Sequence, residues 1–218
     1  MLTRVPLRAV LFDWDGTLLD SYRADTRAYL AMFAALGLPW NLAELSQHYS
    51  PDWHCVYRAA SLPPERWAEA DHLWRRFYRQ ERPALQPGAR HVLHRMARRY
   101  RLGLVTSGSA WRVRAQLRSL ALYSLFAARV FGDEAPRRKP HPAPLRLALR
   151  RIGCEPAACI YVGDTPEDVA MARRAGVAVV GVIGHSPVPE RLREARPDAL
   201  IRKIAALPGL LWRSGRAS

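Results

Sequence analysis

The spacing of apolar residues separates an all-helical stretch from the rest of the chain. Residues 9–13 form a short apolar run that ends in an acid, which is typical of a buried strand. Residues 17–83 then show helical patterns, interrupted at Ser50-Pro51 and at Pro63-Pro64, and they contain no strand pattern. The first strand is therefore followed by an all-helical insertion.

Beyond Pro83, short apolar runs alternate with helical patterns. This alternation predicts an α/β fold in which a parallel, Rossmann-like sheet is covered by helices on both faces. We predict one core domain from residues 1–16 and 84–218, and a second, helical domain from residues 17–83. The predicted strands are 102–106, 128–131, 159–163 and 177–182, and the predicted helices are 88–99, 109–120, 142–152 and 166–175.

Composition restricts the class of protein. The chain has 218 residues and a hydrophobic fraction of 49%, which suits a core large enough for one domain plus a small insertion. No apolar run approaches the roughly 20 residues that span a bilayer, and the first residues do not resemble a signal peptide. The three cysteines, Cys55, Cys154 and Cys159, have no zinc-ligand spacing and are expected to be reduced thiols. We expect a soluble, cytoplasmic protein with no membrane partner.

The positive charge of the chain leaves one alternative function open. The net charge is +15, and because only Lys139 and Lys203 are lysines, arginine carries nearly all of it. Such a charge can attract nucleic acid or steer anionic substrates. The arginines are scattered in pairs within helical patterns, with no aromatic-interleaved basic strip. A basic nucleic-acid-binding protein with an inactive site is therefore kept only as the alternative of another class.

Acidic side chains follow two of the predicted strands. Asp13 and Asp15 come at the end of the first strand, and Asp164 and Asp168 come at the end of the strand at 159–163. Ligands bind beyond the carboxyl ends of parallel strands, so these acids are expected to converge there. Converging carboxylates repel one another, and a hard divalent cation such as Mg²⁺ would relieve that repulsion. Local structure offers a second interpretation, in which Asp13 caps a turn and Asp168 stabilises the first turn of a helix.

Two further segments carry groups that can bind phosphate. Thr106-Ser107-Gly108 follows the strand at 102–106 and supplies hydroxyl and backbone N–H groups near a helix start. Lys139 lies in a proline-rich basic loop, from which an ammonium could reach a phosphate as a point charge. An N-cap for Thr106 and an exposed basic turn for Lys139 are the alternative interpretations.

These segments together resemble a known family. Phe-Asp-Trp-Asp-Gly-Thr-Leu at 12–18, Thr-Ser-Gly at 106–108, Lys-Pro at 139–140 and Gly-Asp-Thr-Pro-Glu-Asp at 163–168 match four ordered motifs of the haloacid dehalogenase-like hydrolase superfamily. The chain is most similar to its phosphoglycolate phosphatase and β-phosphoglucomutase branch. This resemblance implies a Rossmann-like catalytic core, and a helical cap domain formed by residues 17–83.

The resemblance also implies roles for individual residues. Asp13 would be the nucleophile that forms an aspartyl-phosphate, and Asp15 would act as general acid and base. Asp13, the Asp15 carbonyl and Asp164 would hold Mg²⁺, and Asp168 would support the ion directly or through water. The implied metal set is thus Asp13, Asp15, Asp164 and Asp168, and the implied phosphate-binding set is Thr106, Ser107, Gly108 and Lys139.

The implied activity is Mg²⁺-dependent hydrolysis of a small phosphate monoester, with 2-phosphoglycolate as one candidate. Sugar-phosphate transfer, as in β-phosphoglucomutase, is the alternative within the family. Substrate selection would fall to the cap, where Tyr49, Trp53, His54 and Arg58 are candidates, although the two aromatic residues could equally form cap core. The expected partner is a small phosphorylated metabolite, and the expected assembly a monomer or homodimer.

Overall fold

The computed structural model describes the backbone of residues 5–214 and the side chains of residues 5–212. The chain separates into two compact units. Residues up to Leu19 and from Leu85 onward form one, here called the core unit, and Asp20–Ala84 form the other, here called the helical unit. The boundaries predicted from the sequence, 16/17 and 83/84, differ from these by a few residues. That the helical unit acts as a cap stays a prediction.

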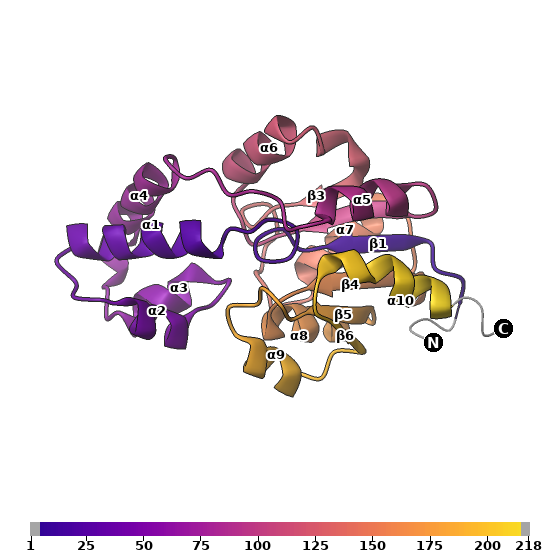
Figure 1. The fold of residues 1–218 in the computed structure, drawn as a ribbon. Helices are drawn as coiled ribbons and strands as arrows, with labels where there is room; N and C mark the ends of the chain where they lie inside the picture. The colour runs from indigo at the N-terminus through magenta and orange to yellow at the C-terminus, as the bar shows by residue number, and fades with distance from the viewer. Residues whose placement is uncertain (1–4, 215–218) are drawn as a thin grey trace. The chain divides into compact units, whose positions relative to one another are not determined.

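The core unit is built on one parallel sheet of six strands (Figure 1). Its order is β3-β2-β1-β4-β5-β6, so β1 is central and is hydrogen-bonded to both β2 and β4. The residues that follow these three strands therefore leave the sheet at the same edge. The strands are β1 (Ala9–Phe12), β2 (Arg101–Val105), β3 (Phe126–Val130), β4 (Cys159–Gly163), β5 (Ala178–Val182) and β6 (Ala199–Ile201).

Helices cover both faces of this sheet (Figure 1). Val10 and Phe12 of β1 pack towards α5, α6 and α10, and Ala9 and Leu11 pack towards α7, α8 and α9. Alternate residues of a strand point to opposite faces, so a strand covered on both sides is apolar throughout, as β1 is. The predicted α/β architecture is confirmed. The helices are α5 (Ala89–Ala97), α6 (Ala110–Ser119), α7 (Ala143–Ile152), α8 (Pro166–Ala175), α9 (Pro189–Glu194) and α10 (Leu207–Ser214), with short 3₁₀ turns at Tyr123–Leu125, Pro156–Ala158 and Ile204–Ala206.

The carboxyl-terminal part contains elements that the sequence analysis did not predict. These are α9, β6 and α10. The strand β6 has three residues and leaves Leu200 exposed, so it is too short to show a strand pattern. Helix α10 contains Pro208 and Gly209, both unfavourable in helices, yet Leu207 and Leu211 bury their side chains in the core. Tertiary packing stabilises these short elements.

The helical unit contains only helices among its named elements, as predicted: α1 (Tyr22–Ala35), α2 (Leu42–His48), α3 (Trp53–Ala59), a 3₁₀ turn (Pro64–Arg66) and α4 (Trp67–Tyr78). Asn41 caps α2 and forms a capping box with Glu44, and Asp52 caps α3. The unit has its own hydrophobic core, in which Met32, Phe33, Leu45, Val56 and Ala70 are fully buried.

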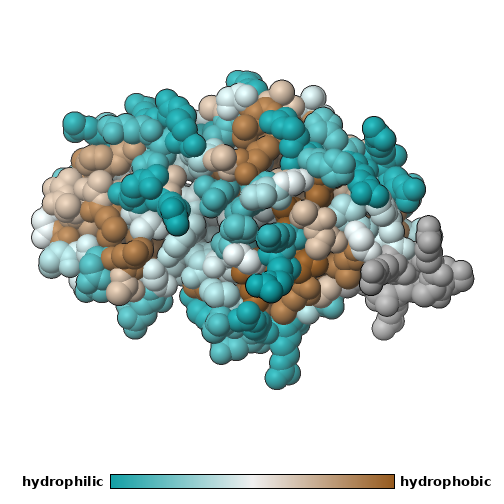
Figure 2. All heavy atoms as spheres, in the orientation of Figure 1, coloured by the Kyte–Doolittle hydropathy of each residue, from teal (hydrophilic) through white to brown (hydrophobic). Residues whose placement is uncertain are grey.

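The surface mixes polar and apolar side chains. Figure 2 shows hydrophilic residues spread between hydrophobic ones over the visible face. The large hydrophobic residues exposed within the described part, Val5, Leu42, Trp111 and Leu200, come from four separate segments. Within that same part, no helix has both the length and the apolar character that crossing a membrane requires.

Candidate active site

The loop after β1 places Asp13 at the central edge of the sheet. Asp13 donates its backbone N–H to the Val162 carbonyl at 2.8 Å, which continues the pairing of β1 with β4, and its side chain is buried. Gly16 then turns the chain with a φ of +79°, a conformation that favours glycine. A Cβ on Gly16 would lie 2.1 Å from Asp164 Oδ2, so only glycine lets the loop pass this close to the second acidic strand end.

Three carboxylates meet where β1 and β4 end. Asp13, Asp164 and Asp168 each offer an oxygen atom within 4.8 Å of the others, and all three side chains are buried. The Thr17 hydroxyl donates to Asp164 Oδ1 at 2.8 Å, and the Ser186 hydroxyl donates to the Asp164 carbonyl at 2.6 Å. The predicted convergence of acids at this edge therefore holds for these three side chains.

Lys139 is the cation of this cluster. Its Nζ donates to Asp13 Oδ1 at 2.5 Å and lies 2.8 Å from Asp168 Oδ1. The residue is 4% exposed, which rules out the exposed basic turn. The loop before α7 folds this ammonium into the carboxylate cluster.

Burial and charge shift the pKa values of the cluster. Burial raises the pKa of Asp13 to about 7, although Lys139 partly offsets the shift, and burial raises the pKa of Asp164 well above its usual range. Burial also lowers the pKa of Lys139, but Asp13 and Asp168 outweigh that effect and raise it overall. Three buried carboxylates thus share a single ammonium. An all-oxygen cluster with surplus negative charge fits a hard divalent cation such as Mg²⁺.

Asp168 organises the loop as well as contributing charge. Its Oδ2 accepts hydrogen bonds from the Thr165 hydroxyl at 2.9 Å and from the backbone N–H groups of Thr165 and Asp164. Its Oδ1 accepts from the Tyr161 hydroxyl at 3.1 Å. With Thr165 it completes the capping box of α8, so the helix-turn interpretation is correct alongside any metal role.

The segment after β2 supplies candidate phosphate-binding groups. Thr106 Oγ1 accepts from the Gly108 N–H at 2.9 Å, and Ser109 is the residue at the N-cap of α6. The N-cap interpretation of Thr106 is therefore wrong, and its hydroxyl shapes the loop instead. The Ser107 hydroxyl is buried without a hydrogen-bond partner among the described residues. A buried, unsatisfied hydroxyl at this edge suits an oxygen-rich ligand.

Comparison with known families agrees with this arrangement. A family model described as haloacid dehalogenase-like hydrolase matches residues 10–182. The chain belongs to the haloacid dehalogenase-like hydrolases. The family suggested by the four motifs is thus confirmed.

Individual relatives of this hydrolase cover nearly its whole length. It is 34% identical over 188 residues to a phosphoglycolate phosphatase of Chromobacterium violaceum, covering 81% of this chain and 85% of the relative. It is 26% identical over 211 residues to the pyrophosphatase PpaX of Bacillus velezensis, covering 94% and 97%. The predicted phosphatase class of enzyme is confirmed.

Solved structures share the fold. A predicted phosphoglycolate phosphatase from Haemophilus somnus superimposes with a TM-score of 0.85 at 22% identity, over 95% of this chain and 99% of the other. A putative β-phosphoglucomutase from Thermotoga maritima gives a TM-score of 0.73 at 25% identity, over 95% and 99%. The similarity to the Haemophilus somnus structure supports the fold alone. The similarity to the putative β-phosphoglucomutase leaves phosphoryl transfer as an alternative function.

The structure of the hydrolase adds residues that the sequence analysis missed. Arg112 of α6 forms an ion pair with Asp15, whose carboxylate lies outside the group of three acids. The Tyr161 hydroxyl of β4 lies 3.0 Å from the Val105 carbonyl and 3.1 Å from Asp168 Oδ1, and its single hydrogen serves both acceptors, which links β2 to the acidic loop. A polar tyrosine within an otherwise apolar strand was the available signal for Tyr161, whereas Arg112 was one of many arginines.

The four specificity candidates lie in the helical unit. Tyr49 makes an edge contact with Tyr22 at 5.6 Å between ring centroids, and Trp53 packs partly buried against the core of that unit. His54 stacks on Trp67 at 4.4 Å, and the exposed Arg58 reaches over the same indole ring at 5.8 Å. Tyr49 and Trp53 thus have packing roles, and substrate selection by any of the four residues stays a prediction.

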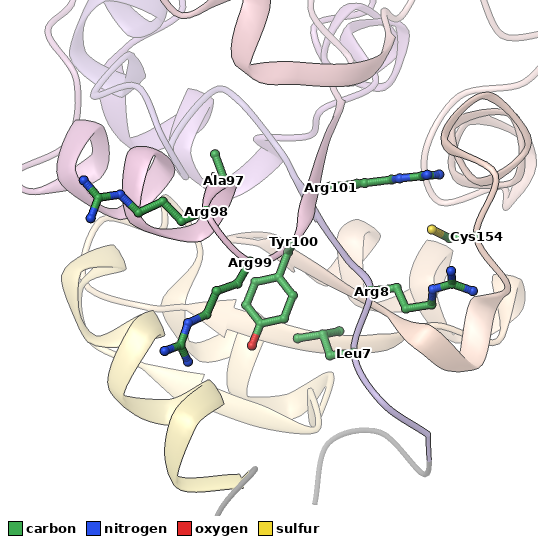
Figure 3. Close-up of a pocket in the computed structure, with 8 residues that line it drawn as sticks. All are labelled: Leu7, Arg8, Ala97, Arg98, Arg99, Tyr100, Arg101 and Cys154. Carbon is green, nitrogen blue, oxygen red and sulfur yellow. The ribbon is translucent and has the colours of Figure 1, made fainter.

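A groove lies at the other end of the sheet (Figure 3). It has a volume of about 420 Å³ and is lined by Leu7, Arg8, Ala97, Arg98, Arg99, Tyr100, Arg101 and Cys154. In Figure 3, Arg98 and Arg99 extend to one side of Tyr100, and Arg8 and Arg101 to the other. The groove is therefore a basic surface at the amino-terminal ends of β1 and β2.

Proposed function

We propose that this hydrolase is a Mg²⁺-dependent phosphatase that cleaves a small phosphate monoester through an aspartyl-phosphate on Asp13. The observation that carries the proposal is the cluster at the strand ends, where the buried Asp13 lies beside the Lys139 ammonium and two further acids. Such a site combines a nucleophile with groups that offset the charge of a phosphoryl group.

The reaction has two balanced halves. The reaction starts with Asp13 ionised and Asp15 protonated. An oxygen of the Asp13 carboxylate attacks phosphorus, the bond to the leaving oxygen breaks, and Asp15 gives that oxygen its proton and becomes a carboxylate. A water molecule then attacks the phosphorus of the aspartyl-phosphate and passes a proton to Asp15. The bond to Asp13 breaks, inorganic phosphate leaves, and both side chains return to their starting states.

The other residues of the cluster bind and orient. Lys139 neutralises charge on the phosphoryl oxygens and on Asp13, to which it is already hydrogen-bonded. The Ser107 hydroxyl follows β2 and is buried without a hydrogen-bond partner among the described residues, so it would donate to a phosphoryl oxygen. The Gly108 N–H donates to Thr106 Oγ1 in this structure and would have to exchange that bond for one to phosphate. Asp13, Asp164 and the Asp15 carbonyl would hold Mg²⁺, supported by Asp168. The bound ion would supply a positive charge that stabilises the phosphoryl transition state.

A small anionic substrate is the favoured class. The two relatives compared above are named for phosphoglycolate and pyrophosphate hydrolysis, and both substrates carry a second anionic group. The net charge of +15 favours such substrates through long-range attraction. We propose 2-phosphoglycolate as the first candidate, with the helical unit acting as the cap that selects it.

A substrate panel tests this function. We expect free phosphate from small anionic phosphate esters, with the highest kcat/KM for 2-phosphoglycolate, in a panel of about a hundred phosphate compounds that includes pyrophosphate. Excess EDTA should abolish turnover and Mg²⁺ should restore it, because surplus carboxylate charge then lacks its counterion. Undiminished turnover in EDTA would remove the metal from the mechanism. No phosphate release across the panel, together with salt-sensitive binding to duplex DNA, would instead favour the nucleic-acid alternative.

Phosphoryl transfer within a sugar phosphate is the second candidate. The similarity to a putative β-phosphoglucomutase favours it, since the nucleophile chemistry is shared. Incubation with β-glucose 1-phosphate and a bisphosphate primer separates the two functions. Glucose 6-phosphate as the main product would identify a mutase, whereas free phosphate supports the phosphatase.

Asp15 should matter most for poor leaving groups. An alkoxide needs a proton as it leaves, while p-nitrophenolate is stable without one. We therefore expect Asp15→Asn to lower kcat for an alkyl phosphate by about 10²- to 10⁴-fold and to affect p-nitrophenyl phosphate much less. The measurement is kcat for both esters at saturating Mg²⁺. Equal losses for both would assign Asp15 to metal positioning.

A further inference from the structure

The Arg112 guanidinium donates hydrogen bonds to both oxygens of the Asp15 carboxylate. Nη1 of Arg112 donates to Oδ1 at 2.8 Å, and Nη2 donates to Oδ2 at 2.6 Å. This is the bidentate geometry in which a planar guanidinium fixes the orientation of a carboxylate. Arg112 is 7% exposed, although arginine is seldom buried unless it is paired.

The sheet order explains why these residues meet. Asp15 follows β1, and α6, which carries Arg112, follows the neighbouring strand β2 (Figure 1). Gly108, in the loop between β2 and α6, leaves room for the pair. A Cβ on Gly108 would lie 2.4 Å from Arg112 Nη2 and 3.1 Å from Asp15 Oδ2. The absence of a side chain at position 108 therefore allows the guanidinium to reach Asp15.

A second contact anchors the same helix to the residue before Asp15. Gln116 lies one turn after Arg112, so the two side chains share a face of α6. Gln116 Oε1 accepts from the indole N–H of the fully buried Trp14 at 2.9 Å, and from Arg112 Nη1 at 3.4 Å. Helix α6 thus holds both Trp14 and Asp15, and with them the loop that carries the proposed acid and base.

We infer that Arg112 is a positioning residue that holds the Asp15 carboxylate in the orientation needed to exchange a proton with the leaving group and with water. The inference rests on the proposed function. Arg112 acts through Asp15, so its effect should appear wherever Asp15 limits the rate and should vanish where Asp15 is absent. Small losses of alignment at a reacting group cost large factors in rate.

The test uses two substitutions at one position. Arg112→Gln removes the planar guanidinium and its charge. Arg112→Lys keeps the positive charge but replaces the bidentate guanidinium with a single ammonium. We expect Arg112→Gln to lower kcat for an alkyl phosphate by about 10- to 100-fold and for p-nitrophenyl phosphate by less than about 3-fold, with little change in KM. Arg112→Lys should give an intermediate loss. Thermal unfolding of each variant checks that it folds, and Arg112→Lys carries the test if Arg112→Gln does not fold.

A double-variant cycle separates positioning from general structural support. In the Asp15→Asn background, adding Arg112→Gln should change kcat for the alkyl phosphate by less than about 2-fold, because coupled residues are not additive. The control is Arg114→Gln, which makes the same substitution on the same helix and breaks the 2.7 Å contact with Glu134. We expect this control to retain the parent kcat for both esters.

Several results would overturn the inference. Arg112→Gln could lower kcat equally for both esters, or its loss could add fully to that of Asp15→Asn, and either would assign Arg112 to structure alone. If the parent enzyme is active and Arg112→Gln has the same kcat as the parent, the inference is wrong and the proposed function still stands. A parent enzyme inactive on both esters refutes the proposed function, and the inference falls with it.

Discussion

Asp13→Asn should lower kcat by at least about 10⁴-fold for every phosphate ester the parent enzyme hydrolyses, because removal of a nucleophile eliminates the covalent route. The substitution keeps the size of the side chain but removes the charge that attacks phosphorus. Unlike Asp15→Asn, it should affect alkyl and aryl esters alike, since both need the same nucleophile. The measurement is phosphate release at saturating Mg²⁺ for the best alkyl substrate and for p-nitrophenyl phosphate.

The same variant should be at least as stable as the parent enzyme when no metal is bound. Burial raises the folded-state pKa of Asp13 to about 7, so ionisation above that pH costs stability relative to the unfolded chain. Asparagine carries no charge and avoids this cost at about pH 8, and the buried Lys139 keeps Asp168 as its ion-pair partner. Asp20→Asn, at an exposed position, is the control and should change neither activity nor the thermal midpoint. Parent-like turnover by Asp13→Asn would refute the covalent mechanism.

Much of the fold could be predicted because its signals are local. A strand covered on both faces must be apolar along most of its length, and β1, β2, β4 and β5 show this in the sequence. Alternation of such runs with helical patterns then specifies a parallel sheet. The elements that were missed, β6 and α10, depend on burial of a few residues against distant parts of the chain. Such packing leaves little trace in a short window of sequence.

The acidic part of the site was predictable for a similar reason. Asp13 and Asp164 each follow an apolar run, and the order of the strands brings their ends together. Lys139 was ambiguous because its loop is rich in arginine and proline, which is typical of an exposed turn. Its burial follows from the fold of the whole core unit. Arg112 could not be predicted, because nothing local distinguishes it from the other basic residues of its helix.

Asp15 shows how the structure refines a prediction made from spacing. Two acids separated by one residue on a strand should point the same way, which suggested that Asp13 and Asp15 enter one cluster. The turn at Gly16 begins immediately after Asp15, and the Asp15 carboxylate pairs with Arg112 instead. The proposed nucleophile and the proposed acid thus have different cations, Lys139 and Arg112. Because Lys139 pairs with Asp13 and Arg112 pairs with Asp15, the orientation of each carboxylate can be fixed independently of the other.

Lys139→Met should have the largest effect on stability. The substitution keeps a long side chain but leaves Asp13 and Asp168, both buried, without the ammonium that lies within 2.8 Å of each. Removing one partner of a buried ion pair typically costs about 3–5 kcal/mol, because the remaining charge is not compensated. We expect a loss of that size in the free energy of unfolding, measured by urea denaturation in EDTA at about pH 8.

The loss should shrink as the pH falls. Without Lys139, burial favours the neutral form of Asp13 still more strongly, so protonation relieves the cost in acid and stability falls as pH rises. The chain provides a matched control, since Lys203 is its only other lysine and is exposed. Lys203→Met should change the free energy of unfolding by no more than about 0.5 kcal/mol. If both substitutions cost the same, the Lys139 ammonium does not hold the buried carboxylates together, and the charge balance assigned to the site is wrong.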